Sequence, residues 1–277
     1  MPIDSADTVQ VPAGSWTFDV SVGGSEHGVP VLLLHGFPQT EECFDQVRER
    51  LHEAGLRTIA PRQRGYSPGA RPKGADQYTM KHLAEDAARI LDALEVPYAH
   101  VVGHGLGATV AWHFAAAYPL RAMSLTAVSF GHPSAFGDAM ANDQDQRQRS
   151  RYLELFLRSG EAEKALLAND ARTLLATAPG GGIEALTDEP TLTAALNWYR
   201  ANLAPGGEGL DCPVIEVPTT LVWGTRDAIA GAAQAKGTAH YLRADYRLSE
   251  VPDGDHWLPL RAPAALASEI ALRTLRN

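Results

Sequence analysis

The stretch that decides the fold is "VVGHGLGATVAW", which runs from Val101 to Trp112. It begins as a short apolar strand, turns through glycines at positions 103 and 107, and opens a helix rich in small residues. A tight strand–turn–helix of this kind is the geometry of a nucleophile elbow, which presents one reactive side chain. The residue expected to carry that side chain is Gly105. The stretch therefore predicts the frame of a catalytic turn without its attacking atom.

Length and composition limit the classes of protein to consider. The chain has 277 residues, 45% of them hydrophobic, which suits one large α/β domain with a modest insertion. Its formal charge of -9 argues against a nucleic-acid partner, because phosphate binding needs a basic face. The only cysteines, Cys43 and Cys212, form neither a disulfide framework nor a metal-ligand spacing, so a reduced, cytoplasmic setting is expected. No signal-peptide pattern and no apolar stretch of membrane-spanning length is visible, so no membrane partner is expected.

Short apolar runs alternate with amphipathic stretches along most of the chain. Strands are predicted at 14–24, where the pattern reads as antiparallel, and at 29–38, 56–61, 99–104, 122–130, 219–224 and 246–252. Helices are predicted at 43–55, 80–94 and 106–119. Strands that alternate with helices in this way form parallel βαβ units. The fold class is therefore α/β, with a doubly wound, mostly parallel sheet.

The segment 133–210 breaks this alternation. It is mostly helical, with predicted helices at 151–168 and 191–203 on either side of the glycine-rich loop 178–182. We interpret it as a helical cap inserted between two strands of the sheet. The core is then expected to consist of residues 1–132 and 211–277.

Two turns are positioned to stabilise negative charge on an oxygen. "HGFP" directly follows a buried strand, so the N–H of Phe37 can point at an oxyanion, and Gly36 lets the chain approach a ligand closely. The N–H of Leu106, at the start of the helix after Gly105, would be a second donor. An ordinary strand-ending turn is the alternative for "HGFP".

A carboxylate and an imidazole follow the last two predicted strands. Asp227 lies just after the strand in "VWGTRDAIA", and His256 lies after the next strand in "VPDGDHWLP". Side chains at adjacent strand ends can meet, and the carboxylate would then fix the imidazole tautomer and stabilise the imidazolium. The alternatives are a helix-capping Asp227 with a loop His256, or Asp255 as the partner; the chain order favours Asp227.

The order "HGFP", "GHxxG", helical insertion, "WGxxD" and "GDHW" resembles the α/β-hydrolase superfamily over nearly the whole chain. Within it, "HGFPQT", "PRQRGYSPGARP", "GATVAWHFAAAYP" and "ALNWYRA" resemble the epoxide-hydrolase branch, whose nucleophile is normally an aspartate in "GHDWG". The resemblance implies that Tyr199 and Tyr152, on the cap, hold the epoxide oxygen as the ring opens; packing within the cap is the alternative. Three positions depart from the pattern of this branch. Gly105 stands where the branch has the aspartate nucleophile, Leu106 where it has tryptophan, and Arg62 where it usually has aspartate. A serine parent, "GHSLG", is also compatible with the turn.

We expect residues beside these motifs to line a capped pocket for an apolar small molecule, namely His35, Gly36, Pro38, His104, Trp198 and Trp257. No cofactor is expected. No cluster has metal-ligand spacing, and "GLGATVAW" lacks the Gly-x-Gly-x-x-Gly spacing of a dinucleotide fingerprint. The expected state is a monomer or a homodimer.

Three functions are compatible with this set of residues. The first is an epoxide-hydrolase-like enzyme in an inactive form, because glycine cannot form the covalent intermediate. The second is a nucleophile-independent isomerase, epimerase, cyclase or lyase of a biosynthetic pathway, in which the His256–Asp227 dyad is the general base beside an oxyanion hole. The third is a non-catalytic small-molecule binder, which the retention of Asp227, His256 and Tyr199 argues against.

Overall fold

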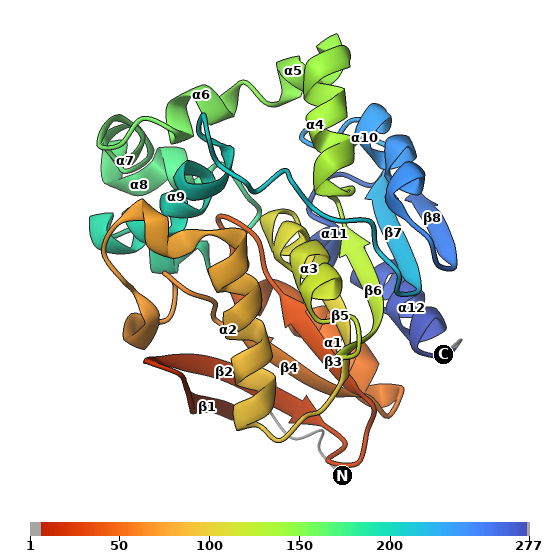
Figure 1. The fold of residues 1–277 in the computed structure, drawn as a ribbon. Helices are drawn as coiled ribbons and strands as arrows, with labels where there is room; N and C mark the ends of the chain where they lie inside the picture. The colour runs from red at the N-terminus through yellow and green to blue at the C-terminus, as the bar shows by residue number, and fades with distance from the viewer. Residues whose placement is uncertain (1–6, 276–277) are drawn as a thin grey trace.

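The computed structural model describes residues 7–275, which form an eight-stranded sheet flanked by helices (Figure 1). The strand order is β1-β2-β4-β3-β5-β6-β7-β8. The strand β2 pairs antiparallel with β1 and β4, and every other pairing is parallel. The strands are β1 (Asp7–Ala13), β2 (Trp16–Gly24), β3 (Pro30–Leu34), β4 (Arg57–Pro61), β5 (Ala99–His104), β6 (Ala122–Val128), β7 (Thr219–Gly224) and β8 (Tyr246–Val251). The predicted α/β fold class, with a mostly parallel sheet, is confirmed.

The central strands are almost fully buried and rich in apolar residues because helices cover both faces of the sheet. In β3, Val31 and Leu33 pack in one buried cluster, whereas Leu32 and Leu34 pack in the other. Helices α1 (Asp45–Glu53) and α12 (Pro263–Thr274) cover the first face, and α2 (Met80–Ala93) and α3 (Leu106–Ala117) cover the second. Side chains that alternate across the sheet thus fill two separate cores.

Two glycines let α3 pack directly against the sheet. A Cβ at Gly103 would lie 2.3 Å from the carbonyl oxygen of Gly107. A Cβ at Gly107 would lie 2.3 Å from the carbonyl oxygens of Leu34 and His35, at the end of β3. The glycines at 103 and 107 therefore bring the turn after β5 against the turn after β3.

Six α-helices lie between β6 and β7. They are α4 (Pro133–Asn142), α5 (Gln144–Arg149), α6 (Tyr152–Phe156), α7 (Glu161–Leu166), α8 (Ala168–Leu175) and α9 (Glu189–Leu203). Figure 1 shows α6 to α9 gathered beyond the end of the sheet to which the arrowheads of β6 and β7 point, and α4 beside α10 (Ala232–Gly237). The limits 133 and 210 of a separate cap unit stay a prediction.

The helix predicted at 151–168 is divided. The helix α6 ends at Phe156 and α7 begins at Glu161, because Gly160 between them has a φ of 80°. An ion pair then fixes the second piece: Arg200 of α9 contacts Glu163 of α7 at 2.8 Å, and both side chains are buried. One strand, β1, is not among those predicted, since it is an edge strand with few buried side chains and its sequence has no continuous apolar run.

Among residues 7–275, no helix is both long enough and apolar enough to cross a membrane. Within the same range, no three His, Cys, Asp or Glu side chains are placed so that they could hold a metal ion.

Four buried histidines are expected to make the fold sensitive to acid. Burial lowers the pKa of His35 and His104 to about 3, and that of His100 and His132 to about 4, from the ordinary value of 6.5. The unfolded chain binds protons at these side chains near pH 6.5, whereas the folded chain does not, so their stabilising contribution is present above that pH and is lost as the pH falls towards 3 to 4.

We expect the free energy of unfolding to fall by about 1 kcal/mol per histidine between about pH 6 and pH 5. Urea unfolding at these pH values measures it. A free energy of unfolding that stays constant over this range would contradict the burial of neutral imidazoles.

Candidate active site

The turn between β5 and α3 places Gly105 close to the imidazole of His256. This residue has φ 54° and ψ -121°, a left-handed conformation that strains any residue with a side chain. An ideal Cβ at position 105 would lie 3.3 Å from Nε2 of His256 and 3.9 Å from its Cε1, with no other group within 4 Å beyond the neighbouring residues. A side chain here would point at the imidazole, and glycine leaves that space empty.

The imidazole is held by Asp227. The Nδ1 of His256 lies 2.9 Å from Oδ2 and 3.1 Å from Oδ1 of Asp227, and both side chains are buried. The N–H groups of Ile229 and Ala230 donate to Oδ1 of Asp227 at 2.7 and 2.8 Å, which fixes the carboxylate. A carboxylate on Nδ1 favours the tautomer with a proton there and leaves Nε2 free to accept one. Asp255, the alternative partner, instead pairs with Arg261 at 3.0 Å.

The two turns that supply backbone donors lie against each other. A Cβ at Gly36 would lie 2.5 Å from the carbonyl oxygen of His104 and 3.0 Å from the nitrogen of Leu106. Only glycine allows this approach. The N–H groups of Phe37 and Leu106 make no hydrogen bond within the described range of the chain. Both N–H groups are therefore free to donate, and the Gly36 contact holds them in neighbouring turns next to Gly105.

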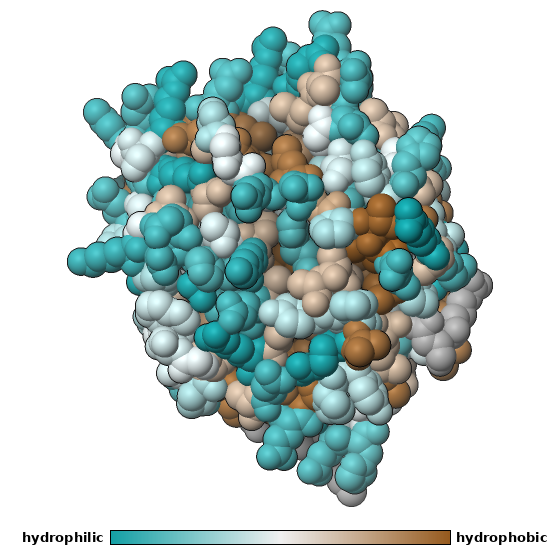
Figure 2. All heavy atoms as spheres, viewed as in Figure 1, coloured by the Kyte–Doolittle hydropathy of each residue, from teal (hydrophilic) through white to brown (hydrophobic). Residues whose placement is uncertain are grey.

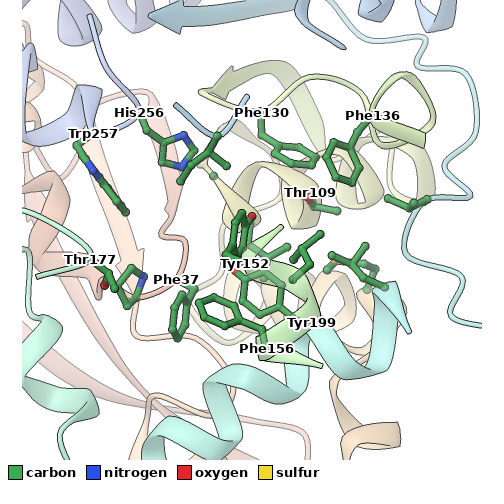
Figure 3. A pocket seen from close by; sticks show the side chains of 18 residues that line it. Phe37, Thr109, Phe130, Phe136, Tyr152, Phe156, Thr177, Tyr199, His256 and Trp257 are labelled. Atoms are coloured by element: carbon green, nitrogen blue, oxygen red, sulfur yellow. The ribbon is translucent and has the colours of Figure 1, made fainter. Parts of the chain in front are cut away.

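A cavity of about 270 Å³ opens in front of these groups. Most of its wall is apolar, and in the part of the chain that the structure describes no Lys, Arg, Asp or Glu side chain lines it. The lining residues with polar side-chain atoms form a small set, which Figure 3 labels: Thr109, whose hydroxyl is itself buried, and Tyr152, Thr177, Tyr199, His256 and Trp257. On the outside, Figure 2 shows hydrophilic residues over most of this face, with apolar residues gathered between α4 and α6. Such a cavity suits a neutral, largely apolar small molecule.

Tyr152 of α6 and Tyr199 of α9 project into the cavity from the helices above the sheet (Figure 3). Their ring centroids are 6.4 Å apart and the rings are perpendicular. Neither hydroxyl makes a hydrogen bond to a residue between 7 and 275. Burial raises the pKa of both well above the ordinary value of 10, so both stay protonated and can donate to an oxygen in the cavity.

Four residues that we expected to contact a small molecule lie behind the cavity wall instead. His35 accepts a hydrogen bond from the N–H of Gln63 at 3.1 Å, and His104 donates from Nε2 to the carbonyl oxygen of His256 at 2.8 Å. Trp198 is fully buried and donates to the carbonyl oxygen of Arg64 at 2.9 Å, and Gly36 packs on the turn after β5. Of the six residues expected to contact the small molecule, only Pro38 and Trp257 line the cavity. A position beside a motif in the sequence does not determine which way a side chain points.

Other lining residues were missed. Thr109 lies four positions after Gly105, so one helical turn places it on the same face of α3, a signal that the sequence contained. Phe130 and Phe136, after β6, had no comparable signal because their segment lacks a motif. Arg62, which departs from the branch pattern, does not line the cavity; its guanidinium donates to Glu41 from Nε at 3.0 Å and from Nη2 at 2.8 Å.

Thr109 offers a test of the buried surface. Its Oγ1 is buried and has no partner among residues 7–275, so Thr109→Val, which keeps the shape and removes the hydroxyl, is expected to raise the free energy of unfolding by about 1 kcal/mol. Thr177→Val is the control, because that hydroxyl donates to the carbonyl oxygen of Leu174 at 2.6 Å and its loss should destabilise the protein by about the same amount. Urea unfolding compares the two; destabilisation by Thr109→Val would show that the hydroxyl has a partner.

Comparison with known proteins agrees with this architecture. The family model described as alpha/beta hydrolase fold matches residues 29–263. An AB hydrolase superfamily protein, YfhM, from Bacillus subtilis is 31% identical over 94% of this chain and 95% of its own length, and epoxide hydrolase 3 from Xenopus tropicalis is 31% identical over 89% and 71%. Among solved structures, an epoxide hydrolase from metagenomes of hot environments has a TM-score of 0.82 at 22% identity, covering 99% of each chain. The epoxide hydrolase of Bacillus megaterium with an inhibitor has a TM-score of 0.82 at 19% identity, covering 96% of this chain and 99% of its own. From the family match and the sequence relatives, the chain belongs to the α/β-hydrolase fold family and has epoxide hydrolases among its relatives.

Proposed function

We propose that this protein is an epoxide-opening enzyme of the α/β-hydrolase fold that works by acid and base catalysis, without a covalent intermediate. In this proposal position 105 is the vacant nucleophile position. The observation that carries it is the 3.3 Å between Nε2 of His256 and an ideal Cβ at Gly105. A base that faces empty space can activate a hydroxyl placed there, whereas glycine itself cannot attack.

The proposed reaction divides the work between two sides of the cavity. Nε2 of His256 takes a proton from a water molecule beside Gly105, and the water oxygen attacks a ring carbon. The ring C–O bond breaks, and the ring oxygen takes a proton from Tyr152 or Tyr199. The proton on Nε2 of His256 then returns to the tyrosinate through solvent, which restores both groups. Asp227, on Nδ1, stabilises the imidazolium that forms. The mostly apolar wall lowers the local dielectric constant, which strengthens each of these interactions.

The origin of the product oxygen tests the route. A single turnover of styrene oxide in oxygen-18 water is expected to place the heavy isotope in the diol immediately, because no enzyme oxygen takes part. Product without the isotope in the first turnover would contradict the proposal. If every epoxide in a panel binds but none is converted, the protein is a binder and not an enzyme for epoxides.

The tyrosine hydroxyls provide a second test. Tyr199→Phe and Tyr152→Phe keep the rings and remove the donors, so each is expected to lower kcat/KM for an epoxide on the order of 10²-fold. Tyr246→Phe is the control, since that hydroxyl is also buried and unpartnered in residues 7–275 but does not line the cavity. Steady-state kinetics on styrene oxide measures the effect, and equal rates for all three variants would remove the tyrosines from the mechanism.

One observation favours a second candidate function. The unpaired N–H groups of Phe37 and Leu106 lie beside the base, an arrangement that suits proton abstraction next to a carbonyl, as in an isomerase, epimerase, cyclase or lyase. This route predicts that a ketone in the cavity exchanges its α-hydrogens with heavy water. Exchange that continues in His256→Ala would exclude it.

A further inference from the structure

Two backbone N–H groups and one imidazole nitrogen lie near residue 105. The N–H of Leu106 begins the 12-residue helix α3, the Gly36 contact brings the turn that contains Phe37 beside it, and neither N–H has a partner in residues 7–275. The Nε2 of His256 faces the space at residue 105 from a side chain that is only 7% exposed, and it too has no partner in that range. A protonated His256 would add a third donor to these two N–H groups.

These donors fit a carboxylate better than other anions. A carboxylate has two oxygens, so one can accept from the two backbone N–H groups and the other from the imidazolium, which Asp227 supports from Nδ1. The start of a long helix favours a single negative charge. No Lys or Arg side chain lines the cavity in the described part of the chain, so the second charge of a phosphate would stay uncompensated.

We infer that the space beside Gly105 binds the carboxylate group of a small acid, the size of formate or acetate, as a second substrate. The chemistry of the step rests on the proposed epoxide opening. A carboxylate oxygen forms a bond to a ring carbon, the ring C–O bond breaks, and the released oxygen takes a proton from Tyr152 or Tyr199. Solvent returns that proton to the tyrosine. The product is a hydroxyalkyl ester, and no oxidant or further reactant is needed.

Binding is tested apart from turnover. Sodium formate is titrated into the protein at constant ionic strength while the ring signals of His256 are followed by NMR. A saturable shift is expected in the native protein. It should be lost in Gly105→Ala, because the new methyl group would lie 3.3 Å from Nε2.

Gly55→Ala is the matched control for this substitution. Gly55 also has a positive φ, of +78°, and nothing within 4 Å of an ideal Cβ, so alanine there adds a methyl group at a positive-φ position outside the cavity lining. It should bind formate as the native protein does. The inference is wrong if formate causes no shift, if Gly105→Ala responds like the native protein, or if the bulkier pivalate gives the same shift.

Turnover then separates the two proposals. Formate is expected to raise the rate of styrene oxide opening on the order of tenfold or more, because the bound nucleophile is held beside the ring, and to yield the formate ester. Hydrolysis without any response to formate, in rate or in NMR, would support the proposed function and overturn this inference. An NMR response without opening of any epoxide would overturn the proposed function and keep the carboxylate site.

The carboxylate can belong to a separate small acid or to an acid group on the epoxide substrate. A third experiment distinguishes these two sources. With 4,5-epoxypentanoate, conversion to a hydroxylactone that formate does not accelerate would assign the site to an acid group on the substrate. Acceleration by formate, with an ester product, would assign it to a free acid.

Discussion

Gly105→Asp is expected to produce an epoxide hydrolase that works through a covalent ester and to raise kcat on the order of 10⁴-fold. That is the size of effect that removal of a nucleophile has in hydrolases of known mechanism. The aspartate Cβ would start 3.3 Å from Nε2 of His256, so its carboxylate would replace the bound nucleophile that we propose. His256 would then activate the water that hydrolyses the ester.

The same substitution has a structural cost. With φ at 54°, a side chain at residue 105 is expected to destabilise the fold by about 1 to 3 kcal/mol. The gain is measured as kcat on styrene oxide, together with mass spectrometry of the trapped ester and the loss of the response to formate. Gly105→Asn is the control, because it brings the same strain and shape without a nucleophilic carboxylate. An aspartate variant that is no faster than the asparagine variant would contradict position 105 as the nucleophile position.

The sheet could be predicted because its central strands carry a strong signal. In β3, β5 and β7, every residue except Pro30 is buried, and each strand carries a short apolar run that ends at a turn or near a glycine. The edge strand β1 pairs on one side only, so its sequence is under weaker constraint and resembles a polar tail. The break between α6 and α7 depends on a single residue, Gly160, inside a pattern that is otherwise helical.

The site could be predicted only where chain order fixes position. Asp227 follows β7 and His256 follows β8. Because these two strands are neighbours in the sheet, the two side chains can meet, and Nδ1 of His256 lies 2.9 Å from Oδ2 of Asp227. Whether a side chain faces a cavity depends instead on tertiary packing. His104 is adjacent to Gly105 in sequence, yet it points behind the wall and contacts the backbone of His256. Such orientations have no signature in one sequence.

His256→Ala is expected to lower kcat/KM for epoxide hydrolysis by about 10² to 10⁴-fold, which is the usual contribution of a general base. The size of the loss follows from the position of the ring: Nε2 faces the space at residue 105, and Nδ1 is fixed by a carboxylate that itself accepts two backbone hydrogen bonds. The His240→Ala variant, in the short helix η5 (Thr238–Tyr241) and outside the cavity lining, is the matched control and should retain full activity. Added imidazole should restore part of the rate in His256→Ala, because the substitution leaves room for the ring beside Asp227. If the alanine variant hydrolyses epoxides as fast as the native protein, then no base at this position takes part, and the empty space beside Gly105 has no catalytic consequence.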